Sequence, residues 1–185
     1  MTVVEAPLAG VRTIALERFD DERGWFAELW NAERYGPAGL PARLVQSNAS
    51  FSRRGTLRGM HFQFPEEQGK LVSVLSGAIF DAVVDIRVGS PTFGHWYGCE
   101  LSVANRTQLW APPGVAHGFL VLSETAVVQY GCTASYAPQS ENTIAWDDPD
   151  VAIGWPAAPH LVSDRDAQAP RLAAMARERL PIFTA

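Results

Sequence analysis

The sequence predicts an all-β fold, either a sandwich or a barrel. About nine short segments are rich in β-branched and aromatic residues and are separated by Gly, Pro, Ser or Asn. In chain order they cover residues 11–19, 24–30, 43–50, 70–75, 78–88, 96–101, 107–111, 114–122 and 126–135. Strands at this spacing are typical of a sandwich or barrel rather than of a parallel sheet that alternates with helices.

The last segment, residues 171–180, breaks this pattern. Its sequence RLAAMARERL follows Pro170 and is dense in residues with high helix propensity. We therefore expect a short C-terminal helix that packs on the outside of the β structure.

Composition limits the function classes. The 185 residues suit one domain, residues 1–185, with a single core. The net charge of −5, with acidic and basic residues interspersed, argues against a nucleic-acid or anionic membrane partner, because either needs a clustered positive field. No apolar run approaches 18 residues and the N-terminal residues do not resemble a signal peptide, so we expect a cytoplasmic protein. Cys99 and Cys132 lack metal-ligand spacing and are expected to be reduced.

Residues 55–68, GTLRGMHFQFPEEQ, resemble the first metal-binding motif of the cupin superfamily: Gly, five residues, His-x-His, three or four residues, Glu. Gly55 and His61 match this motif. Gln63 and Gln68 stand at the positions of the second His and the Glu. Because neutral amides bind divalent cations poorly, this motif predicts a site that has lost its metal.

The second cupin motif, Pro-x-Gly-x-x-His, is matched by Pro112, Gly114 and His117. Neither motif supplies an anionic oxygen ligand. We therefore expect no metal and no other cofactor, and an imidazole that is free for proton transfer near neutral pH.

Six segments together resemble the dTDP-4-dehydrorhamnose 3,5-epimerase family, in the family's order and over about residues 8 to 172. The resemblance implies a double-stranded β-helix, or jelly-roll, barrel without metal. It also implies a homodimer whose N-terminal strands, about residues 10–30, cross to the partner, and the substrate dTDP-4-dehydro-6-deoxyglucose. The segments are DERGWFAELW (21–30), QSNASFSRRGTLRGMHFQ (46–63), QGKLVSVLSGAIFDAVVDIRVGSPTFGHW (68–96), PPGVAHGF (112–119), SYAPQSENTIAWDDPD (135–150) and SDRDAQAP (163–170).

Inverting a carbon beside a ketone requires a base, a group that stabilises the enolate oxygen, and an acid on the opposite face. His61 is the candidate base, and by resemblance Asp166 is the carboxylate that orients it. Lys70 is the candidate for the enolate oxygen. Tyr130 occupies the family's position for the acid, and a phenol with a usual pKa of about 10 is protonated at neutral pH. Each side chain also has an ordinary structural interpretation, such as core packing for Tyr130 or a helix cap for Asp166.

The nucleotide part of the substrate makes further demands. A diphosphate in an acidic protein needs local cations, preferably Arg, and thymine needs an aromatic face and hydrogen-bonding partners. For the diphosphate the resemblance indicates Arg23, Arg58 and Arg165; for thymine it indicates Phe26, Glu28, Gln46 and Asn48, of which the first two would come from the neighbouring subunit; His117 would contact the phosphates or bond within the pocket.

Alternatives of other classes remain at this stage. One is a metal-dependent oxygenase or isomerase on the same barrel, which the missing ligands disfavour. Another is a non-catalytic nucleotide-sugar binder, which would not need His61, Tyr130 and Asp166 together. Within the epimerase interpretation, related enzymes invert only carbon 3 or only carbon 5, and the double epimerase is favoured because it is the commoner activity.

Overall fold

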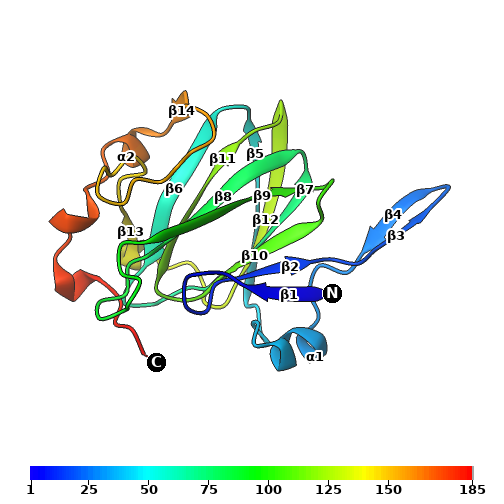
Figure 1. Ribbon diagram of the computed structural model, residues 1–185, viewed down its shortest axis with the longest axis horizontal. Coiled ribbons are helices and arrows are strands. Elements are labelled where there is room, and N and C mark those ends of the chain that lie inside the picture. The colour runs from blue at the N-terminus through cyan, green and yellow to red at the C-terminus, as the bar shows by residue number, and fades with distance from the viewer. Residues whose placement is uncertain (185) are drawn as a thin grey trace.

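The computed structural model describes residues 1–184 and contains two β-sheets that face each other (Figure 1). In spatial order, the first sheet consists of β1 (Thr2–Glu5), β2 (Arg12–Ala15), β10 (Thr107–Ala111), β7 (Lys70–Ser76), β12 (Thr125–Cys132) and β5 (Gln46–Arg53). The second consists of β13 (Glu141–Thr143), β6 (Thr56–Gln63), β11 (Val115–Val121), β8 (Ala78–Asp85) and β9 (Trp96–Ser102), with β14 (Leu161–Val162) beside β6. This architecture confirms the predicted jelly-roll barrel.

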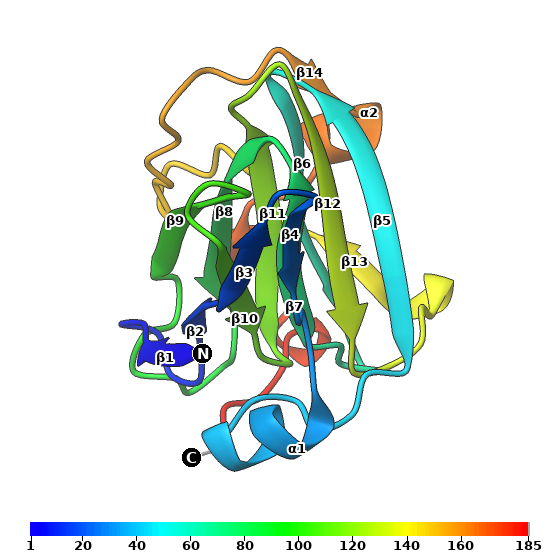
Figure 2. The same ribbon diagram turned by 90° about the vertical axis from the view of Figure 1, so that its right-hand side faces the viewer.

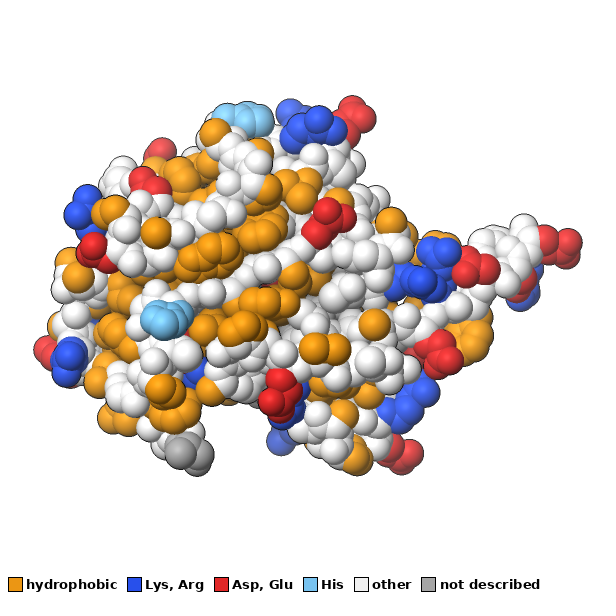
Figure 3. All heavy atoms as spheres, viewed as in Figure 1, with side chains coloured by type: hydrophobic (Ala, Val, Ile, Leu, Met, Phe, Trp, Pro, Cys, Tyr) orange, Lys and Arg blue, Asp and Glu red, His pale blue; other side chains and the backbone are white. Residues whose placement is uncertain are grey.

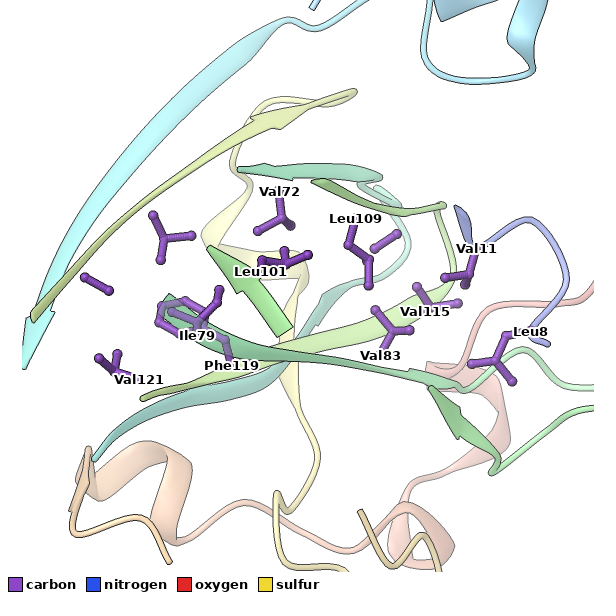
Figure 4. Close-up of a cluster of buried hydrophobic side chains, with 13 residues drawn as sticks. Leu8, Val11, Val72, Ile79, Val83, Leu101, Leu109, Val115, Phe119 and Val121 are labelled. Carbon is purple, nitrogen blue, oxygen red and sulfur yellow. The ribbon is translucent and has the colours of Figure 1, made fainter. Parts of the chain in front are cut away.

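The main core lies between the two sheets and is built from their inward-facing side chains (Figure 4). Val72 and Leu109 come from the first sheet, and Val83, Leu101 and Phe119 come from the second. Alternation along each strand directs these side chains inward. The core fills the middle of the barrel.

A second apolar cluster lies on the outer face of the second sheet, where the C-terminal part of the chain covers it (Figure 1). Met60 and Phe62 of β6 pack there with Leu172 and Leu180. The covering segment fixes β6 from outside. Both faces of β6 are therefore enclosed by protein along most of its length.

The prediction of an α-helix over residues 171–180 is wrong. The segment forms two 3₁₀ turns, η3 (Leu172–Ala174) and η4 (Arg177–Arg179), with extended backbone between them. A helix this short is marginal on propensity alone, and burial of Leu172 and Leu180 decides the local conformation. Tertiary packing therefore overrides helix propensity in this segment.

The predicted strand over residues 11–19 is divided between two elements. β2 ends at Ala15, and β3 (Arg18–Asp21) pairs with β4 (Gly24–Ala27) to form a hairpin, which we call the arm (residues 18–27). Figure 1 shows that the arm projects from the barrel. After it come the short helix α1 (Ala32–Tyr35) and η1 (Gly36–Ala38), which pack at one end of the first sheet.

A buried polar network holds the base of the arm. The Tyr35 hydroxyl lies 2.9 Å from both the carbonyl oxygen of Leu29 and the side-chain oxygen of Gln108, and it donates its single proton to one of these two acceptors. The Gln108 amide donates in turn to the Leu29 carbonyl and to Ser73. The arm is thus anchored to β7 and β10 by satisfied hydrogen bonds.

Figure 3 shows hydrophobic side chains across much of the middle of one face, with charged side chains of both signs mainly around its edge. Among residues 1–184, no helix has the length and apolar character that a bilayer crossing requires.

A buried carboxylate organises the turn between β8 and β9. Asp85 accepts hydrogen bonds from the Arg87 guanidinium, at 2.9 Å from both nitrogens, and from the hydroxyls of Ser90 and Thr92, each at 2.6 Å. Burial raises the pKa of Asp85, but these hydrogen bonds outweigh burial and hold it below its usual value. The residues in this turn serve packing and turn geometry, as expected for a Gly- and Pro-rich segment.

We predict that Asp85→Asn lowers the free energy of unfolding at pH 7 by about 3 kcal/mol, because it leaves Arg87 buried without its counter-charge. The contribution of Asp85 is present above the pKa of an unfolded Asp, about 3.9, and is lost as pH falls through the lower folded pKa. The gap between wild type and variant should therefore narrow below about pH 3.9. Urea unfolding at pH 7 and at lower pH measures this difference in unfolding free energy. Asp147→Asn, at an exposed position, is the control. A constant gap would contradict this assignment.

Candidate active site

The centre of the site is an imidazole paired with a buried carboxylate. His61 lies on β6, and its Nε2 is 2.7 Å from Oδ1 of Asp166. Asp166 belongs to the short helix α2 (Asp164–Ala167) and is only 4% exposed. β14 pairs in parallel with the start of β6, so the chain that follows β14 places α2 beside His61.

Two groups bond to the Asp166 carboxylate, and a third holds its backbone. His61 lies against one oxygen, and the backbone N–H of Gly59 donates to the other at 3.2 Å. Ser163 caps α2 by accepting from the Asp166 N–H at 3.2 Å. Burial raises the pKa of Asp166, but the hydrogen bonds from His61 and Gly59 help to outweigh burial and hold it below its usual value. An ionised carboxylate accepts the proton of Nε2, so Nδ1 of neutral His61 is left to accept a proton.

A cavity of ≈ 100 Å³ lies between the sheets at this end of the barrel. His61 lines it from the second sheet, whereas Lys70 of β7 and Tyr130 of β12 line it from the first. Cross-strand pairing places Tyr130 opposite Asn48 of β5. The remaining lining residues are Gln46, Asn48, Phe62, Gln63, Gln68, Tyr136 and Glu141.

Burial gives the two polar groups on the first sheet unusual properties. It lowers the pKa of the Lys70 ammonium, against the opposing effects of Cys132, Glu141 and Asp81. Within residues 1–184, the Lys70 side chain makes one hydrogen bond, a long one of 3.4 Å to the backbone carbonyl of His61. Burial raises the pKa of Tyr130, so its phenol is protonated at neutral pH. The cavity thus contains an ammonium and a phenol whose polar atoms are available to a ligand.

A second cleft, of ≈ 400 Å³, is also lined by His61. Arg58 and Arg165 both line it, together with Asp166. Arg58 donates to Ser52 at 3.0 Å, and Arg165 lies 2.7 Å from a carboxylate oxygen of Glu141. Two guanidinium groups are therefore close to the imidazole in an otherwise acidic chain.

Two residues of the site carried no assigned role at the level of sequence. Glu141 joins the two clefts, because it accepts from Arg165 and, at 2.6 Å, from the hydroxyl of Tyr136. Burial raises the pKa of Glu141, but its bonds to Arg165 and Tyr136 outweigh burial and lower it. Tyr136 and Glu141 both lie within the segment SYAPQSENT. In the sequence, only the family resemblance of this segment indicated that it could belong to the site.

The residues at the former ligand positions do not fit a metal. The amide of Gln63 donates to the carbonyls of Glu66 and Ser135, and that of Gln68 donates to the carbonyl of Ala134. His61 and His117 point to different carboxylates, since His117 bonds to Asp81 at 2.8 Å. No group of three or more His, Cys, Asp or Glu side chains within residues 1–184 is arranged to hold a metal ion.

Some of the predicted binding residues lie away from both clefts. Arg23 and Phe26 are exposed on the arm, where Arg23 bonds to Asp21, and Glu28 follows the arm and bonds to Arg34. His117 neighbours His61 across β11 and β6 but is buried. The structure therefore brings together His61, Asp166, Lys70, Tyr130, Gln46, Asn48, Arg58 and Arg165.

Comparison with known proteins identifies the family. The family described as dTDP-4-dehydrorhamnose 3,5-epimerase matches residues 5–174. A relative of that name from Pseudomonas aeruginosa is 49% identical over 153 residues, which cover 81% of this chain and 84% of the relative. A crystal structure of a dTDP-6-deoxy-D-glucose-3,5-epimerase from Legionella pneumophila, in complex with dTDP-4-keto-L-rhamnose, has a TM-score of 0.96 and 45% identity, covering 100% of this chain and 99% of that one.

A 3′-monoepimerase from Streptomyces bikiniensis, in complex with dTDP-quinovose, is also similar, with a TM-score of 0.90 and 35% identity over 96% of this chain and 91% of that one. The fold and these matches define an isomerase of the cupin-type jelly-roll class. Within that class, the chain belongs to the dTDP-4-dehydrorhamnose 3,5-epimerase family.

We predict that His61→Ala raises the pKa of Asp166, because the variant removes a hydrogen bond that favours the carboxylate while burial remains. Titration of ¹³C-labelled aspartate carboxyls by NMR measures the shift. His95→Ala, at an exposed position outside both clefts, is the control and should leave this pKa unchanged. An unchanged Asp166 pKa in His61→Ala would show that the two side chains are not coupled.

Proposed function

We propose that this chain converts dTDP-4-dehydro-6-deoxy-D-glucose to dTDP-4-dehydro-L-rhamnose, by deprotonation and reprotonation next to the 4-ketone, in dTDP-L-rhamnose biosynthesis. The observation that carries the proposal is the 2.7 Å contact between His61 and Asp166, on the wall of a cavity that also contains Lys70 and Tyr130. The sugar nucleotide bound to the Legionella pneumophila relative supports the choice of substrate.

In this proposal His61 is the base. Its Nδ1 removes the proton from the carbon beside the ketone, and the imidazolium that forms is stabilised by Asp166. The carboxylate also keeps the ring in one orientation and one tautomer. A positioned base of this kind contributes about 10²- to 10⁴-fold to the rate.

Lys70 stabilises the enolate oxygen. Its ammonium is desolvated, and it makes a single long hydrogen bond within residues 1–184, so it can turn towards an oxygen that gains negative charge. Charge stabilisation is strongest in a site that excludes water. The position of Lys70 on β7, across the cavity from His61, supports this role.

Tyr130 is the acid that returns the proton to the opposite face. Inversion requires that the base and the acid approach the sugar ring from two sides. His61 belongs to the second sheet and Tyr130 to the first, and both line the cavity between them. This placement on facing walls supports the assignment.

The nucleotide would extend from the cavity towards the charged cleft. Arg58 and Arg165 suit the diphosphate, because a guanidinium group can donate two parallel hydrogen bonds to a phosphate. The side-chain amides of Gln46 and Asn48 can form hydrogen bonds with thymine. The Gln46 amide also donates to Asn48 Oδ1 at 2.9 Å, which holds the two side chains in place. For His117 we propose a role within the pocket wall, beside His61 and bound to Asp81.

We further propose that the protein is a homodimer in which the arm of each subunit completes the site of the other with Arg23, Phe26 and Glu28. The exposed side chains of the arm include Phe19, Trp25 and Phe26, of which Phe26 is 69% exposed. Figure 2 shows the arm in front of the outer face of the first sheet, where Phe51 is also exposed. A partner would cover these apolar surfaces.

The cysteines suit a reducing compartment. Cys99 and Cys132 are both unpaired, and free thiols persist where disulfides do not form. We therefore propose that the enzyme works in the cytoplasm.

Turnover in deuterated water tests the proposed reaction. Wild type should incorporate deuterium at both carbon 3 and carbon 5, which NMR of the product would show. In Tyr130→Phe, exchange at carbon 3 should survive better than net inversion, because His61 can still remove and return a proton on one face. Label at carbon 3 alone in wild type would favour a 3-epimerase, as in the similar Streptomyces bikiniensis protein. Equal loss of exchange and inversion in Tyr130→Phe would remove Tyr130 as the acid.

Mixing two defective variants tests the exchanged arm. His61→Ala should lose at least about 10²-fold in turnover, and Arg23→Ala should raise the KM. In a mixed dimer, one site would carry both defects and the other would have a normal base and a normal arm. After the variants are unfolded and refolded together, about one quarter of all sites should regain wild-type kinetics. Activity no higher than the average of the separate variants would exclude the exchange.

A further inference from the structure

The strand that carries His61 contains a β-bulge at the site. His61 pairs with His117 across β6 and β11, and Arg58 pairs with Phe119. Two residues of β6, Gly59 and Met60, thus oppose the single residue Gly118 on β11. Bulges of this kind re-aim the side chains that follow them.

The bulge places Arg58 and His61 on one face of the sheet. In a regular strand, residues three apart point to opposite faces. Their partners His117 and Phe119, however, are two apart and share a face, and Arg58 and His61 line the same cleft. Without the extra residue, the guanidinium and the imidazole would lie on opposite sides of the sheet.

The bulge fits only because position 118 has no side chain. A Cβ added to Gly118 would lie 2.6 Å from the sulfur of Met60, 2.8 Å from the carbonyl oxygen of Arg58 and 3.0 Å from Cα of Gly59. Two of these three atoms belong to the backbone of β6, so a side-chain rotation cannot relieve the overlap. The backbone of Gly118 itself has no left-handed φ that would exclude alanine.

The bulge also contains a backbone donor to the carboxylate. The N–H of Gly59 points to the β14 side of β6, away from β11, and donates to Asp166 Oδ2 at 3.2 Å. The other oxygen of Asp166 faces His61. A displacement of the bulge therefore acts on both members of the pair.

We propose that Gly118 is a positioning residue for this reaction, because its missing side chain admits the bulge that aligns Arg58 and His61 and that contains Gly59, the backbone donor to Asp166. The inference rests on the proposed function, in which His61 is the base. Gly118 itself contacts no substrate and acts through β6.

Gly118→Ala tests the proposal, with Gly98→Ala as the matched control. Gly98 lies on β9 of the same sheet, and its added Cβ would be 2.6 Å and 2.8 Å from the ring of Phe80 and 3.1 Å from the Asp81 carbonyl, away from the bulge. We expect kcat for dTDP-4-dehydro-6-deoxyglucose to fall about 10²-fold in Gly118→Ala, as for a misplaced catalytic group, and to stay within about 3-fold of wild type in Gly98→Ala.

The pKa of Asp166, followed by ¹³C NMR, separates positioning from a general loss of stability. It should rise in Gly118→Ala, because a displaced bulge weakens the Gly59 hydrogen bond to the carboxylate, and should not change in Gly98→Ala. An unchanged kcat and Asp166 pKa in folded Gly118→Ala would overturn the inference. If His61→Ala retains full turnover, the proposed function fails instead; if His61→Ala is inactive while Gly118→Ala is normal, only the positioning role fails.

A measurement on wild type covers the case in which Gly118→Ala does not fold. The amide proton of Gly59, observed after selective ¹⁵N-glycine labelling, should shift with pH along the same titration curve as the Asp166 carboxyl. The amide proton of Gly98 should not follow this curve. A Gly59 amide that is insensitive to the ionisation of Asp166 would overturn the inference without any variant.

Discussion

The buried carboxylate of Asp166 is the constraint on which the site depends. It lies 105 residues from His61 in sequence, and burial disfavours its charge. Three local features offset that cost: the parallel pairing of β14 with β6, the Ser163 cap of α2, and the hydrogen bond that the Gly59 N–H donates to the carboxylate. The pair of His61 and Asp166 is therefore a product of tertiary structure on both sides of β6, and neither residue is positioned by its own strand or helix alone.

In the proposed reaction, the two sheets contribute different groups. The second sheet presents His61, whereas the first presents Lys70 and Tyr130. Inversion of a carbon needs groups on both faces of a flat enolate, and two facing sheets would supply them. The core between the sheets keeps their separation fixed below the cavity. In this respect the stability of the barrel and the geometry of the reaction have the same origin.

The sequence predicted the elements that have clear boundary signals. Residues 107–111 form β10 with the predicted bounds, because Asn105 precedes that strand and Pro112 follows it. β6 was not predicted as a strand, since the bulge places one extra residue between Arg58 and His61 and breaks the alternation. The helix at 171–180 failed because burial of Leu172 and Leu180 outweighed propensity. The convergence of Asp166 on His61 could be expected only from the family resemblance, because no local spacing relates residues so far apart.

The contacts within one chain do not account for the order of the whole arm. A two-stranded hairpin is marginally stable in water, and this one exposes Phe19 and Trp25 as well as Phe26. The network of Tyr35 and Gln108 orders only its base. The rest of the arm must gain its order from apolar contact with another surface, and in the proposed dimer that surface is the partner's substrate site. Ordering of the arm and completion of the nucleotide pocket would then be the same event, so that dimerisation contributes directly to substrate affinity.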